Sequence, residues 1–192
     1  KKGSNYVSDG FSHLIDFKVN NQEAGEKNSE LSVAANSILN ISVRAAAMLS
    51  ETQDQQGKYI AARAPELFPY WNIERARIGT SRNINVELIV NGQLVEKKVI
   101  AADGSWNNVS FSYQIKKSSW IAVRVNSSAH TNPIFVIVNG KPIVEKNSAQ
   151  WCRDAVDKCW STKSPAIRKE ELEAARIAYD YARKAYESLL EK

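Results

Sequence analysis

The chain has 192 residues with 26 basic and 21 acidic side chains, and therefore a formal net charge of +5. Hydrophobic residues make up 43% and charged residues 24%, which excludes a disordered chain, a collagen-like fibre and a disulfide-rich mini-protein. No apolar run approaches the ~20 residues of a membrane-spanning helix, so we expect no membrane span. The basic residues are scattered or paired, as at Lys97-Lys98, so we expect no nucleic acid partner.

Apolar residues alternate with polar ones through most of residues 12–145, as at Ile15, Phe17 and Val19. Alternation places one face of a strand in a core and the other in solvent. Between two such runs, Asn91-Gly92 predicts a tight hairpin turn. We therefore predict a mainly β fold, an antiparallel two-sheet β-sandwich of about eight strands. The predicted strands are 12–19, 38–46, 72–78, 84–90, 94–100, 107–115, 119–126 and 134–138.

Residues 50–71 have no clear period, although they contain Tyr59, Phe68, Tyr70 and Trp71. A connection of this length is often functional or contacts a partner. The alternative is an Ω-loop whose aromatic side chains cap the end of the sandwich. Large aromatic side chains more often pack than bind, which favours the loop.

After residue 146 the pattern changes to that of helices. Ser148 is a candidate N-cap for a first amphipathic helix. Ser164-Pro165 then predicts the start of a second one of about two dozen residues, because Pro is favoured at the first helical position. We divide the chain into a sandwich, 1–147, and a C-terminal pair of α-helices, 148–192. The helical tail is expected to pack on the sandwich or on an absent N-terminal catalytic domain.

The chain holds few residues that could bind a metal ion. Cys152 and Cys159 are seven residues apart in the first predicted helix, a rise of ~10.5 Å that is too long for a disulfide. Their spacing matches no zinc motif, so we expect free thiols. His13 and His130 are the only histidines, and neither belongs to a paired metal-binding motif.

Two interpretations of the histidines remain open. We favour hydrogen bonds from each imidazole to backbone groups of a turn. The alternative is a catalytic triad of His130, Asp9 and a serine, although the sequence shows no nucleophile elbow.

Arginines occur in two predicted strands. If 72–78 is a strand, Arg75 and Arg77 share one of its faces and Glu74 takes the other. Arg124 lies in a strongly apolar strand. We expect an arginine in such a strand to pair with a carboxylate across the sheet or between domains, and a pocket for an acidic ligand is the alternative.

Five segments match one family together and in order. They read YVSDGFSHL at 6–14, PYWNIERAR at 69–77, SSWIAVR at 118–124, HTNPIFV at 130–136 and SAQWC at 148–152. From about Tyr6 to its end, the chain thereby resembles the C-terminal portion of the CehA/McbA-like metallohydrolases, relatives of carbaryl hydrolase. The catalytic part of that family is a PHP (polymerase and histidinol phosphatase) domain.

The resemblance implies that the chain is a non-catalytic accessory domain of a bacterial PHP-type metal-dependent hydrolase. The family's metal ligands belong to the PHP domain, which would precede Lys1. We therefore expect a divalent metal in that domain, and no cofactor, metal ligand or catalytic residue in this chain. The expected partner is the PHP domain of the same protein, and the oligomeric state stays open.

On this hypothesis, the accessory domain packs against the catalytic domain and shapes its substrate entrance. One alternative is a free-standing carbohydrate- or ligand-binding module that uses Trp71 and Trp106 as an aromatic platform. A further alternative is an enzyme that uses His130. Candidate contact residues are the polar and aromatic ones that gather near predicted loops. They are Asp9, His13, Tyr70, Trp71, Glu74, Arg75, Arg124, His130 and Asn132.

Overall fold

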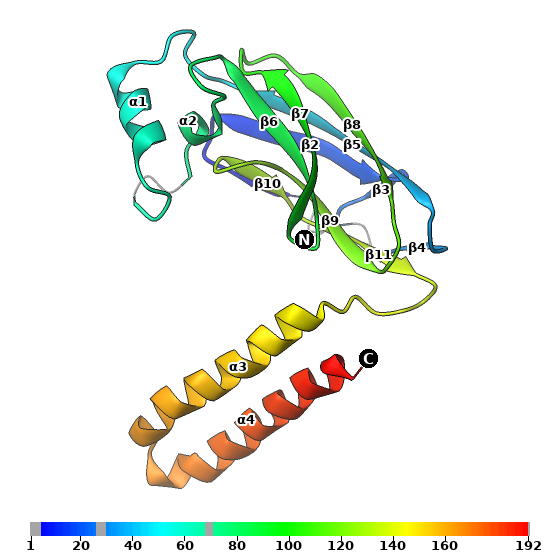
Figure 1. The fold of residues 1–192 in the computed structure, drawn as a ribbon, viewed down its shortest axis with the longest axis vertical. Helices are drawn as coiled ribbons and strands as arrows, with labels where there is room; N and C mark the ends of the chain where they lie inside the picture. The colour runs from blue at the N-terminus through cyan, green and yellow to red at the C-terminus, as the bar shows by residue number, and fades with distance from the viewer. Residues whose placement is uncertain (1–4, 26–29, 68–70, 192) are drawn as a thin grey trace. The chain divides into compact units, whose positions relative to one another are not determined.

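A computed structural model describes residues 5–25, 30–67 and 71–191 (Figure 1). The chain forms two compact units, Lys1–Pro142 and Ile143–Lys192. The first unit contains all the strands of the described residues and two short helices, and the second contains two long helices.

The first unit consists of two β-sheets, which confirms the predicted mainly β, two-sheet class. The smaller sheet has the strand order β3-β2-β5-β8, and in the larger sheet β9 pairs with β6, β10 and β11. All described pairs are antiparallel except β4 with β11, which is parallel. The strands are β1 (Tyr6–Ser8), β2 (Ser12–Val19), β3 (Gln22–Glu23), β4 (Glu30–Val33), β5 (Ile38–Ala47), β6 (Asn83–Val90), β7 (Gln93–Ala101), β8 (Asn107–Gln114), β9 (Ser119–Val125), β10 (Ala129–Thr131) and β11 (Ile134–Val138).

Every predicted strand except one is present, to within one residue at each end. The exception is 72–78, where the structure has the helix α2 (Ile73–Ala76). The side chain of Asn72 accepts a hydrogen bond from the backbone N–H of Glu74 (2.9 Å), which is the N-cap arrangement of a helix. The predicted strand was wrong because its apolar residues Ile73 and Ala76 are three apart, which is the spacing of one helical turn and not of a strand.

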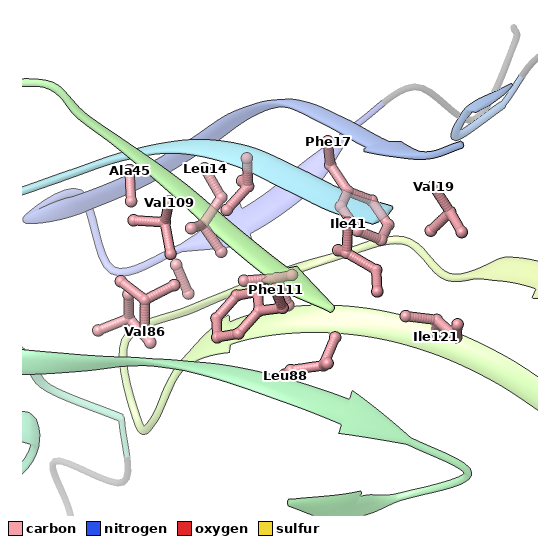
Figure 2. Close-up of a cluster of buried hydrophobic side chains, with 14 of the residues drawn as sticks. Leu14, Phe17, Val19, Ile41, Ala45, Val86, Leu88, Val109, Phe111 and Ile121 are labelled. Carbon is pink, nitrogen blue, oxygen red and sulfur yellow. The ribbon is translucent and has the colours of Figure 1, made fainter. Parts of the chain in front are cut away.

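The core lies between the two sheets (Figure 2). Leu14 of β2 and Phe111 of β8 face Val86 of β6 in this layer, and all three are buried. The alternation predicted for β2 fails at one point. Asp16 adopts a left-handed backbone conformation (φ 54°), and the register with β5 shifts there. Leu14 is therefore buried in place of Ile15, whereas Phe17 and Val19 point inward as predicted.

The turn between β6 and β7 confirms the predicted hairpin. Asn91 and Gly92 both have positive φ angles, 49° and 82°. These are the conformations of a type I′ turn, which matches the twist of the flanking strands.

The second unit is a helical hairpin. Helix α3 (Lys146–Lys163) begins after Glu145, so Ser148 lies within the helix and is not its N-cap. Ser164-Pro165 belongs to the short 3-10 helix η1 (Ser164–Ala166), and α4 (Lys169–Leu190) follows Arg168. The helices pack against each other, with the rings of Trp160 and Tyr179 5.0 Å apart.

The helical hairpin contains both cysteines, Cys152 and Cys159, and both are free as predicted. Its inner face lines an apolar groove of about 450 Å³. Among the helices that the structure describes, none is long and apolar enough to cross a membrane.

Candidate functional site

A pocket of about 780 Å³ lies where the segment between β5 and β6 meets the turn between β9 and β10. That segment carries α1 (Gln55–Ala62) and α2, which lie together at one end of the sandwich in Figure 1. Trp71, Arg75, Arg124 and His130 from the sequence-predicted candidates line the pocket. The fold thus brings together residues from two distant parts of the chain, 71–75 and 124–130.

The segment predicted as an Ω-loop or an insert contains a helix. Asp54 caps α1 by accepting a hydrogen bond from the backbone N–H of Gly57 (2.6 Å). Tyr59 and Trp71 are exposed by 61% and 59%, so neither aromatic ring caps the core as the Ω-loop interpretation required. The other two aromatic residues, Phe68 and the candidate Tyr70, lie outside the described residues.

Arg75 shapes one wall of the pocket. Its guanidinium donates hydrogen bonds to the backbone carbonyls of Arg63 (2.9 Å) and Ala64 (3.1 Å), which follow α1. Arg75 thereby holds the end of α1 against α2 and positions Arg63, another residue of the pocket lining.

Glu74 and Arg77 stabilise the base of the same segment instead of lining the pocket. Arg77 donates from Nε to Oε2 of Glu74 (2.8 Å) and from Nη2 to Oε1 (2.9 Å), and its side chain is fully buried. It also donates to the carbonyls of Ser50 (3.1 Å) and Ser81 (3.0 Å). Because α2 is a helix, Glu74 and Arg77 lie on one side of it, which corrects the predicted shared face of Arg75 and Arg77.

Arg124 of β9 lies opposite Glu87 of β6. The distance from Arg124 Nε to Glu87 Oε2 is 2.7 Å. This ion pair confirms the prediction that an arginine in this strand finds a carboxylate across the sheet. On its other side, Arg124 is paired in register with His130 of β10.

His130 lies on strand β10 and not in a turn. Its Nδ1 is 3.3 Å from the carbonyl oxygen of Thr131, a backbone contact as expected. Asp9, the acid of the hypothetical triad, instead accepts from Ser128 Oγ (2.8 Å) and from the backbone N–H of Phe11 (2.9 Å). The described contacts therefore do not assemble a triad of His130, Asp9 and a serine.

His13 and Asn132, like Asp9 and Glu74, lie outside the pocket lining. Nδ1 of His13, on strand β2, is 2.7 Å from the hydroxyl of Tyr6, so its partner is a side chain and not the backbone of a turn. The His13 ring also lies 6.4 Å from that of Trp106. The side-chain amide of Asn132 donates to the Asn5 side chain (2.6 Å).

Sequence reasoning missed Arg63 and Ser128, which line the pocket. The guanidinium of Arg63 lies 5.3 Å from the centre of the Tyr59 ring. The spacing of four residues between Tyr59 and Arg63 was a local signal of this contact, because residues four apart are neighbours on a helix. Among the described residues, no group of three or more His, Cys, Asp and Glu side chains could hold a metal ion.

These observations define the chain as a mainly β, two-sheet unit followed by a helical hairpin. No family model and no curated protein matches it. One similar solved structure is a CARDB domain from Pyrococcus furiosus, crystallised in complex with di-metal ions. It has 9% identity and a TM-score of 0.35 over 69% of this chain and 100% of that domain. A solution NMR structure of a CARDB domain from the same organism has 13% identity and a TM-score of 0.33. The match covers 67% of this chain and 98% of that domain.

Proposed function

We propose that this chain is a non-catalytic accessory part of a bacterial PHP-type metal-dependent hydrolase, and that its pocket borders the substrate entrance of the catalytic domain. The proposal follows from the sequence resemblance. In it, the divalent metal and the catalytic residues belong to an N-terminal PHP domain of the same protein. This chain then contributes binding surface and no chemical step.

The observation that carries the proposal is the convergence of Trp71, Arg75, Arg124 and His130 on one pocket. They belong to segments that are distant in sequence, so the fold and not chain proximity gathers them. Trp71 keeps most of its surface exposed there. An exposed aromatic ring beside polar groups in a concave site is typical of a surface that contacts a ligand or partner.

The proposal is tested first on the reading frame that encodes the chain. A PHP-type domain must be encoded upstream of Lys1, and its absence would contradict the accessory role. In the complete protein, Trp71→Ala is expected to raise KM about fivefold while kcat and bound metal stay within about twofold, because a contact at the entrance affects substrate binding and not chemistry.

Trp106→Ala is the matched control, since this exposed tryptophan contacts His13 and Arg44 and does not line the pocket. Equal effects of the two substitutions on KM would count against a role of the pocket.

A second candidate function is a carbohydrate- or ligand-binding module, and the exposed Trp71 in the pocket wall favours it. In this case calorimetry detects binding of polysaccharides to the 192-residue chain, and Trp71→Ala abolishes the heat signal. Absence of binding to every polysaccharide tested would reject this candidate.

A further inference from the structure

We propose that the pocket binds a small organic carboxylate, with the carboxylate held by Arg63, Arg124 and His130 and the apolar body of the ligand against Trp71. This inference rests on the proposed function, because it assigns a ligand to the same pocket. It goes further because it names the chemistry that the pocket recognises.

The first support is the charge of the lining. Three arginines and one histidine line the pocket, and none of the lining residues that the structure describes is acidic. Guanidinium groups bind carboxylates through short, charge-assisted hydrogen bonds, often in pairs. A pocket with this lining favours an anion over a neutral or cationic ligand.

The second support is the availability of donors. Nε of Arg124 is bonded to Glu87, but its two Nη groups make no hydrogen bond within the described part of the chain. The guanidinium of Arg63 lies over the Tyr59 ring and pairs with no described carboxylate. His130 uses only Nδ1, which leaves Nε2 available in the same part of the structure. An acceptor in the pocket would satisfy these groups.

The third support is that two of the donors are held in place before any ligand binds. Arg124 and His130 are opposite residues of the antiparallel pair β9–β10, so their side chains lie on the same face, with Cβ atoms ~5 Å apart. The ion pair with Glu87 restrains Arg124 further. Donors fixed on strands lose little freedom when a ligand binds.

The remaining lining explains why the ligand should be organic. Val7, Ala61, Pro65, Trp71 and Ala129 supply apolar surface. The volume of about 780 Å³ is far larger than one carboxylate requires and lies in the usual range for small-molecule sites. A carboxylate attached to an aromatic or aliphatic body would use both parts of the pocket.

The test is calorimetry on the complete 192-residue chain with benzoate and hexanoate, and with benzamide as the neutral counterpart of benzoate. We expect saturable binding of the carboxylates and binding of benzamide that is at least about tenfold weaker, because the charge-assisted hydrogen bonds are lost. Inorganic phosphate is expected to bind more weakly than benzoate, because it leaves the apolar wall unused.

Arg63→Gln is expected to weaken benzoate binding about tenfold. Arg44→Gln is the matched control, since Arg44 also lies over an aromatic ring, Trp106 at 5.2 Å, but outside the pocket lining. Arg124→Gln alone would leave the nearly buried Glu87 carboxylate unpaired, so the double variant Glu87→Gln/Arg124→Gln is used, with its fold checked by circular dichroism. It is also expected to weaken binding about tenfold.

Three results would overturn this ligand class: equal affinity for benzoate and benzamide, equal loss in Arg63→Gln and Arg44→Gln, or no saturable carboxylate binding up to about 10 mM. The assay needs no catalytic domain. Its failure therefore rejects the carboxylate ligand alone, whereas a reading frame without a PHP-type domain rejects the accessory role alone.

Discussion

Arg124 on β9 and Glu87 on β6 form an ion pair of 2.7 Å between neighbouring strands of the larger sheet. The two side chains differ in burial, since Glu87 is 9% exposed and Arg124 is 39% exposed. The carboxylate therefore depends on the arginine for its charge compensation, while the arginine still reaches the pocket.

The first prediction concerns this pair. Arg124→Ala should lower the free energy of unfolding by about 2 kcal/mol, because it leaves a nearly buried carboxylate unpaired; partial exposure of the arginine reduces the cost below that of a fully buried pair. Urea denaturation measures the change. Glu87→Gln/Arg124→Gln should recover most of the loss, and an Arg124→Ala variant as stable as the parent would contradict the prediction.

The second prediction concerns Arg77, which makes two hydrogen bonds to Glu74 from a fully buried position. Arg77→Lys keeps the charge but removes the planar pair of donors, so it should destabilise the first unit by about 2 kcal/mol. Arg176→Lys is the matched control, because Arg176 makes the same paired contact with Glu173, also three residues away, but in solvent. Its urea midpoint should not change, and equal shifts in both variants would disprove the role of burial.

The third prediction concerns Gly57, which lies inside α1. A Cβ atom there would come within 2.9 Å of Cδ of Glu74. Glu74 cannot move away easily, because Arg77 and Gln53 both hold its carboxylate. Gly57→Ala should therefore destabilise the first unit by about 1 kcal/mol, although alanine is normally the better helix former.

Thermal unfolding measures the effect of Gly57→Ala. Gln56→Ala serves as the control, because Gln56 is the exposed neighbour in the same helix. A higher melting temperature for Gly57→Ala would show that Glu74 does not pack against this position.

The fourth prediction concerns pH and the helical hairpin. The hydrogen bond from Arg183 (2.5 Å), together with the charge of Arg153, holds the pKa of Asp157 below its ordinary value of 3.8. Because the folded-state pKa is the lower one, the stabilisation is complete above the unfolded-state pKa. It is lost as the pH falls through the folded-state pKa. The helices should therefore melt at lower temperature in acid, below about pH 4.

Circular dichroism melts of the complete chain between about pH 2 and pH 7 test this dependence. Asp157→Asn should flatten the acid limb of the curve, since the amide does not titrate. Asp154→Asn should leave it unchanged, because Asp154 is more exposed and lies 3.8 Å from Arg153. If the melting temperature of Asp157→Asn falls in acid as much as that of the parent, the pH dependence arises from other carboxylates and the prediction is wrong.

Local patterns were sufficient for most of the sandwich. The alternation at Leu39, Ile41 and Val43 predicted β5 because burial repeats every two residues in a strand. The same reasoning failed at Ile15, since the left-handed Asp16 is part of a register shift that depends on the neighbouring strand. The short strands β1, β3, β4 and β10 were not predicted, because a strand of two to four residues is too short to show an alternating pattern.

The candidate site was predictable only in part. Trp71, Arg75, Arg124 and His130 were recognised as candidates by residue type. Arg63 was missed because it lies in a segment without periodicity. Glu74 was placed among the contact residues, although its carboxylate is occupied by Arg77 and Gln53.

By itself, the sequence determined the two-sheet class, the type I′ turn at Asn91-Gly92 and the two long helices, because each depends on residues that are close in the chain. Only the tertiary structure decided that the predicted strand 72–78 contains the helix α2 (Ile73–Ala76), that Glu87 is the partner of Arg124, and that one pocket joins Trp71 to His130. These features depend on which strands become neighbours and in what register, and that choice is set by burying the whole core at once.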